Sequence, residues 1–284
     1  MKRKIILVTL MAVIAGVCSG CGEGEYVAEK KYFHANRKLA ILEKSAKEGK
    51  ELDKALINEL VFAYKEIILR YPFWDNAIPA QFNVALLYRM KNDLEQARKE
   101  YERICKDNSR DKENCANALR HIANIWEQEN NWEEAEKVYK KIHEEYRFTI
   151  VGTLVPIYLA QKYYIRGEIE KSKIATEYAY NFYKEFISSQ PENIASITAI
   201  DFLIECARSL GATDDMAVFI QALADKHPNT VIELRCLYKL GRFYQDVEKQ
   251  SQAALKYYTE VLQKYPDSKI AQDLSKEIKT FSKE

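Results

Sequence analysis

Apolar residues recur with the period of an α-helix along almost the whole chain, and this pattern restricts the fold more than any other feature. Residues 93–104 are typical, because Leu94, Ala97, Tyr101 and Ile104 form one apolar stripe between charged positions. Only nine glycines and six prolines occur among 284 residues, under half of the usual share of ~12%. Sandwiches, barrels and dinucleotide-binding folds need these residues for turns. The sequence therefore predicts an all-α protein.

One four-position motif repeats along the chain with constant spacing. A small residue and an aromatic on one helix are followed by a small and a bulky residue on the next. The small residues would let the two helices approach closely, and the bulky ones would fill the groove between neighbouring hairpins. The four copies are Ala85, Tyr88, Ala97 and Tyr101; Ala123, Trp126, Ala135 and Tyr139; Ala160, Tyr163, Ser172 and Thr176; and Gly241, Tyr244, Ala253 and Tyr257.

This spacing resembles the tetratricopeptide repeat (TPR), a hairpin of two helices with small and aromatic residues at fixed positions. The resemblance implies an α-solenoid of about five to six TPR-like hairpins with a capping helix at its C-terminal end. We expect an N-terminal helical hairpin at residues 26–75, a TPR-like array at 76–266 and the capping helix at 267–284.

The N-terminal segment has the composition of an export signal. Lys2, Arg3 and Lys4 precede an uncharged run over residues 5–17, which is shorter than the ~20 residues that span a bilayer and fits a signal peptide over residues 1–20. Ser19, Gly20 and Cys21 then resemble a bacterial lipobox, although Cys18 stands where leucine is usual. This resemblance implies a lipid on Cys21 and a short tether at 21–25, with an ordinary cleaved signal as the alternative.

The lipobox, the short tether and the helical repeats together resemble the BamD (YfiO) family of outer-membrane assembly lipoproteins. The periplasmic YbgF/CpoB proteins are the second match. The BamD resemblance implies a periplasmic scaffold that holds protein partners near the outer membrane, where the lipid on Cys21 would anchor it. The YbgF/CpoB resemblance implies a periplasmic protein of cell-envelope coordination. The BamD family offers no catalytic residues to carry over, so we expect no enzyme activity.

The concave face of a TPR array is lined mainly by the first helix of each hairpin. Arginine and aromatic residues dominate binding hot spots, so this face would suit an extended peptide or a helix. A binding module for a cell-wall or glycan ligand is the alternative function. The repeat phase places these candidates in the groove: Phe82, Arg89, Arg120, Asn124, Gln161, Tyr164, Tyr238 and Arg242.

Two cysteines lie at either end of a short predicted linker between hairpins. An oxidising compartment would permit a disulfide between Cys105 and Cys115, and closing so short a loop would contribute about 2–3 kcal/mol. The alternative is two reduced, half-buried thiols.

No motif in the chain indicates catalysis, a cofactor or a metal ion. His143 and Glu144 begin a sequence that resembles a zinc-binding helix, but position 147 is Arg and not His. The net charge of +1 gives no electrostatic footprint for nucleic acid. We therefore expect no cofactor, no metal and no nucleic-acid partner.

Overall fold

The computed structural model describes the backbone of residues 2–281 and the side chains of residues 24–278. Within this part the chain consists of α-helices and one π-helical segment, without a strand, which confirms the all-α prediction. Cys21, the predicted lipidation site, lies outside the residues whose side chains are described. None of the helices searched there is both long enough and apolar enough to cross a membrane.

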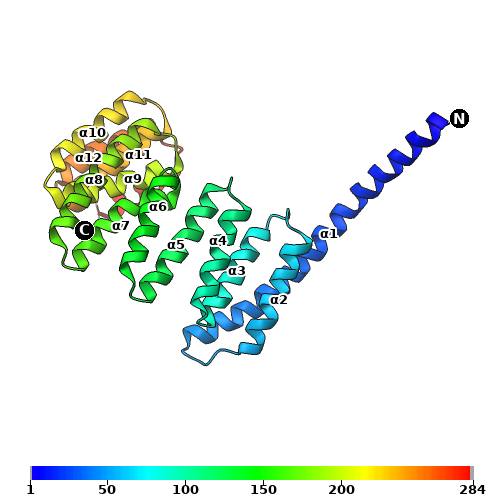
Figure 1. Cartoon of the computed structure of the whole chain (residues 1–284). Helices are drawn as coiled ribbons and strands as arrows, with labels where there is room; N and C mark the ends of the chain where they lie inside the picture. Colours follow the sequence, from blue (N-terminus) through cyan, green and yellow to red (C-terminus); the bar gives the residue numbers. More distant parts are fainter. Residues whose placement is uncertain (1, 282–284) are drawn as a thin grey trace. The chain divides into compact units, whose positions relative to one another are not determined.

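The chain divides into two compact units, Met1–Tyr139 and Lys140–Glu284. Figure 1 shows their helices in chain order. The first unit holds α1 (Lys2–Lys47), α2 (Lys54–Arg70), α3 (Ala77–Met90), α4 (Leu94–Asp107), α5 (Lys112–Gln128) and the first part of α6 (Trp132–Tyr146). The second holds the rest of α6, α7 (Ile150–Ile165), α8 (Ile169–Ser189), α9 (Ile194–Leu210), α10 (Thr213–Lys226), α11 (Val231–Arg242), η1 (Phe243–Val247), α12 (Ser251–Lys264) and α13 (Lys269–Phe281).

In the first unit, neighbouring helices pack side by side from α1 to α5. Aspartates start several of these helices, because their carboxylates accept hydrogen bonds from amides that the helix leaves unsatisfied. Asp53 accepts from the amides of the first turn of α2, Asp93 from Gln96 and Asp111 from Asn114. Residues 21–47 include the predicted tether and the first part of the predicted N-terminal hairpin. In the structure they all belong to α1, which runs through them without a break.

In the second unit, α7 contacts both α8 and α9, and α9 contacts both α10 and α11. Contact with the next helix and with the one after it is the arrangement of stacked hairpins. The last helix, α13, packs on α12 and buries Ala271 and Leu274.

The turns inside the hairpins share one geometry. A residue with positive φ ends the first helix at Asn92, Asn130 and Gly167, and the next amide bonds a carbonyl five residues back, as in a Schellman C-cap. These bonds are Asp93 N to Tyr88 O at 2.9 Å, Asn131 N to Trp126 O at 2.8 Å and Glu168 N to Tyr163 O at 2.8 Å.

The last hairpin departs from this geometry because it contains a π-helical turn. The segment Phe243–Val247 follows α11 without a break, and Gln250 N bonds Tyr244 O six residues back, at 2.8 Å. A π turn adds one residue to the helix. The second helix of this hairpin therefore starts one position later than the repeat spacing predicts.

This extra residue corrects the predicted repeat phase in the last copy. Ala254 and Tyr258 are buried on α12, whereas the predicted Ala253 and Tyr257 are only half-buried. The ring of Tyr258 lies so close to Gly241 that a Cβ added there would approach it to 2.4 Å.

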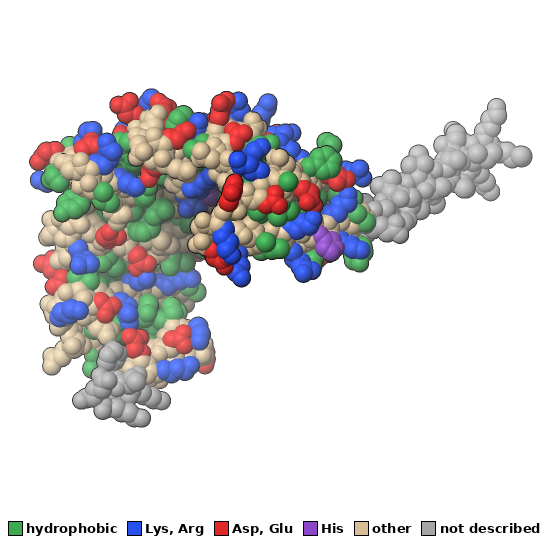
Figure 2. Space-filling view, turned by 90° about the horizontal axis from the view of Figure 1, so that it is seen from below, with side chains coloured by type: hydrophobic (Ala, Val, Ile, Leu, Met, Phe, Trp, Pro, Cys, Tyr) green, Lys and Arg blue, Asp and Glu red, His purple; other side chains and the backbone are tan. Residues whose placement is uncertain are grey.

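Lys, Arg, Asp and Glu side chains are interspersed over the face drawn in Figure 2. This mixture agrees with the nearly neutral composition of 43 basic and 42 acidic residues. A surface of mixed charge gives no broad field of one sign. Any recognition by charge must therefore come from local clusters.

Candidate functional site

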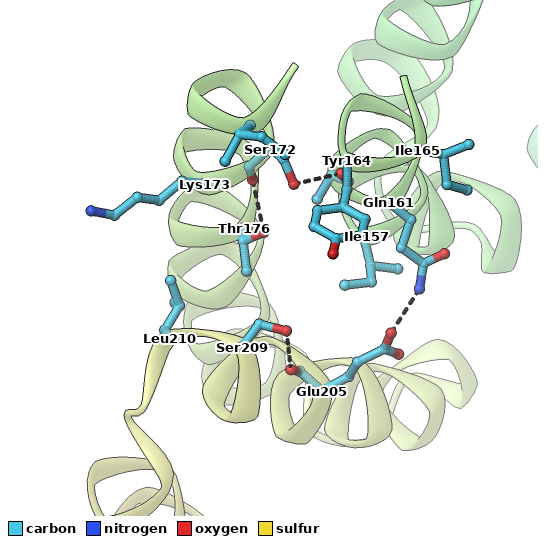
Figure 3. A pocket seen from close by; sticks show the side chains of 12 residues that line it. Ile157, Gln161, Tyr164, Ile165, Ser172, Lys173, Thr176, Glu205, Ser209 and Leu210 are labelled. Atoms are coloured by element: carbon cyan, nitrogen blue, oxygen red, sulfur yellow. Dashed lines mark hydrogen bonds between the residues drawn. The ribbon is translucent and has the colours of Figure 1, made fainter. Parts of the chain in front are cut away.

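A groove of about 640 Å³ lies between α7, α8 and α9 in the second unit. Figure 3 shows the side chains that line it. Gln161 and Tyr164, both predicted from the repeat phase, come from α7, and Glu205 comes from α9. We call this site the α7–α9 groove.

The shape of α7 depends on Pro156 inside the helix. Proline has no N–H, so the carbonyl of Gly152 loses its helical partner. Nδ1 of His143 lies 3.3 Å from this oxygen and takes that place. The Tyr183 hydroxyl fills the next gap, because it donates to Thr153 O at 2.9 Å and accepts from Ile157 N at 3.2 Å. The interrupted helix is thus held by buried side chains.

The floor of the groove is formed by small polar residues of α8. Ser172 Oγ donates to Ala160 O on α7 at 2.9 Å, and Thr176 Oγ1 donates to Ser172 O at 2.8 Å. Both hydroxyl groups already donate to carbonyl oxygens of the protein, so these two donors need no hydrogen-bond partner from a ligand. Figure 3 shows both bonds.

The α7–α9 groove is also lined by exposed apolar side chains and by one hydrogen bond between α7 and α9. Tyr164 is 67% exposed, and Ile165 and Ile169 are 76% and 54% exposed. Gln161 Nε2 donates to Glu205 Oε1 at 2.7 Å, which connects α7 with α9 across the groove. Exposed apolar side chains beside exchangeable hydrogen-bonding groups can bind an amphipathic peptide.

Three other predicted groove residues gather around a histidine in the first unit. His121 stacks on Tyr101 with ring centroids 4.8 Å apart, and Phe82 packs edge-on against His121 at 5.9 Å. Arg89 and Arg120 are near enough to lower the pKa of His121 electrostatically. Phe82 is therefore used partly for packing and is not wholly presented to a ligand.

The two arginines retain hydrogen-bonding capacity. Arg89 Nε donates to Gln128 at 3.3 Å, and Arg120 Nη2 donates to Asn117 at 3.3 Å. Arg120 Nε and His121 Nδ1 are buried and find no partner among the described residues. The two guanidinium groups beside His121 suit a carboxylate or another anionic group, although the buried Arg120 Nε is closed to solvent.

The buried His121 is expected to make the stability of the fold sensitive to acid. Burial, followed by the charges of Arg120 and Arg89, lowers the pKa of His121 from 6.5 to about 4. Between pH 6.5 and 4 the imidazole is therefore protonated in the unfolded chain but not in the folded chain. The free energy of unfolding falls as the pH drops through this window. We expect a loss on the order of 2 kcal/mol over this window. Denaturant unfolding at each pH measures it.

The matched variants are His121→Phe, which keeps an aromatic ring on Tyr101, and His34→Gln on the exposed part of α1. The first should flatten the pH dependence between 6.5 and 4, and the second should leave it as in the parent. An unchanged slope in His121→Phe would show that other groups cause the acid sensitivity.

The remaining predicted groove residues are engaged by neighbouring side chains. Asn124 Oδ1 accepts from the Tyr139 hydroxyl at 2.8 Å within its own hairpin. Arg242 bonds Glu277 at 2.7 Å and pairs with Asp246 at 3.1 Å. Tyr238 packs toward the buried Tyr258. Tyr238 and Arg242 do not line the α7–α9 groove of their unit, and Asn124 belongs to the first unit.

The sequence left two alternatives open for Cys105 and Cys115, a disulfide or two thiols. The structure has Cys105 and Cys115 as thiols. Cys105 Sγ donates to Cys115 O at 3.3 Å, and Cys115 Sγ lies 3.6 Å from Asn108 O. Each sulfhydryl is thus directed at a backbone carbonyl and not at the other sulfur.

A second groove of about 450 Å³ lies between α6, α7 and α8, and the repeat phase did not predict it. Ile174 and Tyr178 on α8 line it and are 65% and 55% exposed. The signal was an apolar pair at i and i+4 on the side of α8 away from its buried stripe. His143 borders this groove, and its Nε2 lies 2.8 Å from the Tyr178 hydroxyl. Burial lowers the pKa of His143.

Within the part of the chain that the structure describes, no three His, Cys, Asp or Glu side chains are grouped as metal ligands would be.

Solved structures with similar chain folds include three proteins of different lengths. A human IFIT1 dimer with m7Gppp-AAAA is 15% identical, with a TM-score of 0.43, over 78% of this chain and 48% of that chain. BtubC from P. vanneervenii is 16% identical, with a TM-score of 0.39, over 75% of this chain and 92% of that one. Pseudomonas aeruginosa pilF is 12% identical, with a TM-score of 0.36, over 87% and 99%.

This chain spans about half the length of the IFIT1 chains that it matches. No curated protein sequence matches the chain significantly. The family model of the tetratricopeptide repeat does match, at residues 79–109 and 235–268. These ranges cover α3 with α4, and most of α11 with η1 and α12. The chain therefore contains tetratricopeptide repeats within an all-α helical repeat fold.

Proposed function

We propose that this chain is a membrane-anchored, extracytoplasmic TPR scaffold that binds a protein partner in the α7–α9 groove. The observation that carries this proposal is the exposure of Tyr164, Ile165 and Ile169 beside the Gln161–Glu205 bridge. TPR repeats generally serve as protein-binding scaffolds and not as catalysts.

The chemistry of the groove favours a peptide with apolar side chains. Apolar contacts supply most of the affinity at such sites, while a few polar groups fix orientation. Tyrosine is enriched among the residues that dominate binding energy. The exposed ring of Tyr164 is the anchor we expect a partner to cover. In the first unit, Arg89 and Arg120 would bind an acidic group of a partner.

The proposed location rests on the N-terminal sequence. A basic start, a short apolar run and Ser19-Gly20-Cys21 support export and lipidation at Cys21. The combination of this segment with TPR repeats supports a place among BamD-like or YbgF-like envelope proteins. In this proposal the scaffold serves outer-membrane or cell-envelope assembly at the periplasmic face of the outer membrane.

A photo-crosslinking residue at position 164, compared with one at position 178, tests the groove in cells. Tyr164 and Tyr178 are similarly exposed and lie in different grooves of the same unit. We expect a protein adduct at position 164 that is absent at 178. With the purified partner, Tyr164→Ala should weaken binding about tenfold or more, whereas Tyr178→Ala should leave the affinity unchanged.

Two outcomes would overturn the proposal. Equal affinity in both variants would remove the α7–α9 groove as the binding site. A glycan adduct at position 164, without a protein adduct, would instead favour the alternative of a cell-wall ligand.

A further inference from the structure

One face of α1 is exposed and carries apolar side chains. Tyr26, Phe33 and Ile41 are 66%, 58% and 60% exposed, although large apolar residues usually find a partner in a folded chain. The spacing of seven and eight residues places the three on one side of the helix. The buried residues of α1, which pack toward α2, lie on the opposite side: Ala28, Ala35, Leu39 and Leu42.

Basic residues alternate with these apolar residues. Lys30, Arg37 and Lys44 follow at helical spacing and lie within the same narrow sector. We call this surface the outer face of α1, defined as Tyr26, Lys30, Phe33, Arg37, Ile41 and Lys44. At ~1.5 Å per residue it extends along the helix for ~27 Å.

Two of the three cations on the outer face have no acidic partner among the described side chains, whereas Lys44 pairs with Glu48 at 3.9 Å. Lys30 and Arg37 form no ion pair with any residue whose side chain the structure describes. The Arg37 guanidinium lies 6.0 Å from the centroid of the Phe33 ring. Helical spacing places the acidic Glu29 and Glu43 to one side of this sector.

Aromatic residues alternating with cations are the composition of a helix that lies on an anionic membrane. Tyr and Phe rings occupy the interfacial region, while Lys and Arg bind the phosphate headgroups. A second copy of this chain is a poorer occupant, because a twofold contact would bring the same cations against one another. Tyr26 also follows Cys21 by only five residues, which would hold the outer face near a bilayer.

We propose that the outer face of α1 binds the headgroups of an anionic phospholipid bilayer and orients the helical array along it. This inference rests on the proposed anchoring at Cys21 and adds to it a second membrane contact. A helix with a basic and aromatic face binds through buried apolar area and electrostatic attraction together. The contact would thus fix which side of the array faces the membrane, which a lipid anchor alone does not determine.

The test uses the processed chain from residue 21 with Cys21→Ser, so that no lipid contributes. This form retains all the described core residues, since the first of these is Ala28. We expect it to sediment with vesicles of phosphatidylcholine and phosphatidylglycerol, to remain in solution with phosphatidylcholine alone, and to dissociate as salt is raised.

Lys30→Glu with Arg37→Glu should weaken vesicle binding at least tenfold. Lys106→Glu with Arg110→Glu is the matched control, because both positions are exposed in the same unit and the charge change is equal. Tyr26→Ala with Phe33→Ala should weaken binding without changing its salt dependence. Circular dichroism melting checks that each variant folds.

Equal vesicle binding by the two charge-reversal variants would overturn the proposal, as would absence of binding to the anionic vesicles. Sedimentation of the chain as a dimer that Lys30→Glu with Arg37→Glu disrupts would assign the face to self-association instead. These outcomes leave the partner-binding test of the α7–α9 groove unaffected, because that test reads binding of a protein in solution.

Discussion

Replacing Glu233 with alanine is expected to lower the free energy of unfolding by about 2–3 kcal/mol. Glu233 is only 4% exposed and accepts hydrogen bonds from the Asn229 amide and Lys264 Nζ, both at 2.6 Å, and from the Tyr265 hydroxyl. These contacts tie the start of α11 to the end of α12. Removing the carboxylate would leave the Asn229 amide and the Tyr265 hydroxyl without their acceptor, while Lys264 keeps its contact with Glu260.

Glu260→Ala is the control for the loss of a charge beside Lys264. Glu260 pairs with Lys264 at 2.7 Å but is about one-third exposed, so we expect less than ~1 kcal/mol. Urea unfolding of both variants measures the difference. Equal midpoints would show that burial adds nothing to the Glu233 contacts.

Glu233 also sets a direction for acid unfolding. Burial alone would raise the pKa of the Glu233 carboxyl, but the bonds from Lys264, Tyr265 and the Asn229 amide outweigh it and hold the pKa below 4.5. The stabilisation is complete above the ordinary pKa and is lost as the pH falls through the folded value. Glu233→Gln should therefore flatten the stability profile on the acidic side of pH 4.5.

The helices and the first three hairpins could be predicted because the responsible interactions are local. The period of the apolar residues selects helices, and the small and aromatic positions identify the faces that pack. Ala85, Ala97 and Tyr101 are buried as the repeat phase predicts. The turns after Tyr88 and Trp126 also follow it, since asparagine tolerates the positive φ that ends each helix.

The last hairpin shows where spacing fails. Tyr257 and Tyr258 are adjacent tyrosines, and counting favours the first as the buried one. The π turn at Phe243–Val247 inserts a residue, so Tyr258 packs on Gly241, and Tyr257 stacks on Tyr244 with centroids 5.6 Å apart. A π turn depends on tertiary packing and leaves no periodic signal in the sequence.

The candidate site was predictable in position and not in composition. Helical phase placed Gln161 and Tyr164 on the side of α7 that lines a groove. Helical phase could not show that Asn124 would accept a hydrogen bond from Tyr139, or that Arg242 would donate one to Glu277. Whether a side chain is already hydrogen-bonded within the protein depends on residues that are distant in sequence.

Glu233 stands in a sequence pattern that is typical of the start of a helix. Residues 230–233 read Thr-Val-Ile-Glu, the S/T-x-x-E pattern of a capping box at a helix start. In the structure, Thr230 Oγ1 accepts from Glu233 N at 3.3 Å, while the Glu233 carboxylate returns to Asn229 N. The pattern predicts the cap, but the added bonds from Lys264 and Tyr265 need the folded hairpin.

A second large effect is expected at Gly152, in the first turn of α7. A Cβ added there would lie 1.9 Å from Tyr146 O and 2.6 Å from the Tyr146 carbonyl carbon. The obstacle is backbone, so no side-chain rotation relieves it. Thr149 fixes the corner by donating to Tyr146 O at 2.7 Å and accepting from Gly152 N at 2.9 Å.

Gly152→Ala should therefore destabilise the chain by about 3 kcal/mol, even though alanine is the better helix former by ~1 kcal/mol. Gly167→Ala is the control, because its φ of +77° is strained for alanine but nothing lies within 4 Å of the added Cβ. It should cost about 1 kcal/mol. Thermal and urea unfolding compare the two. If Gly152→Ala proved as stable as the parent, the close packing of α7 against the end of α6 would be wrong.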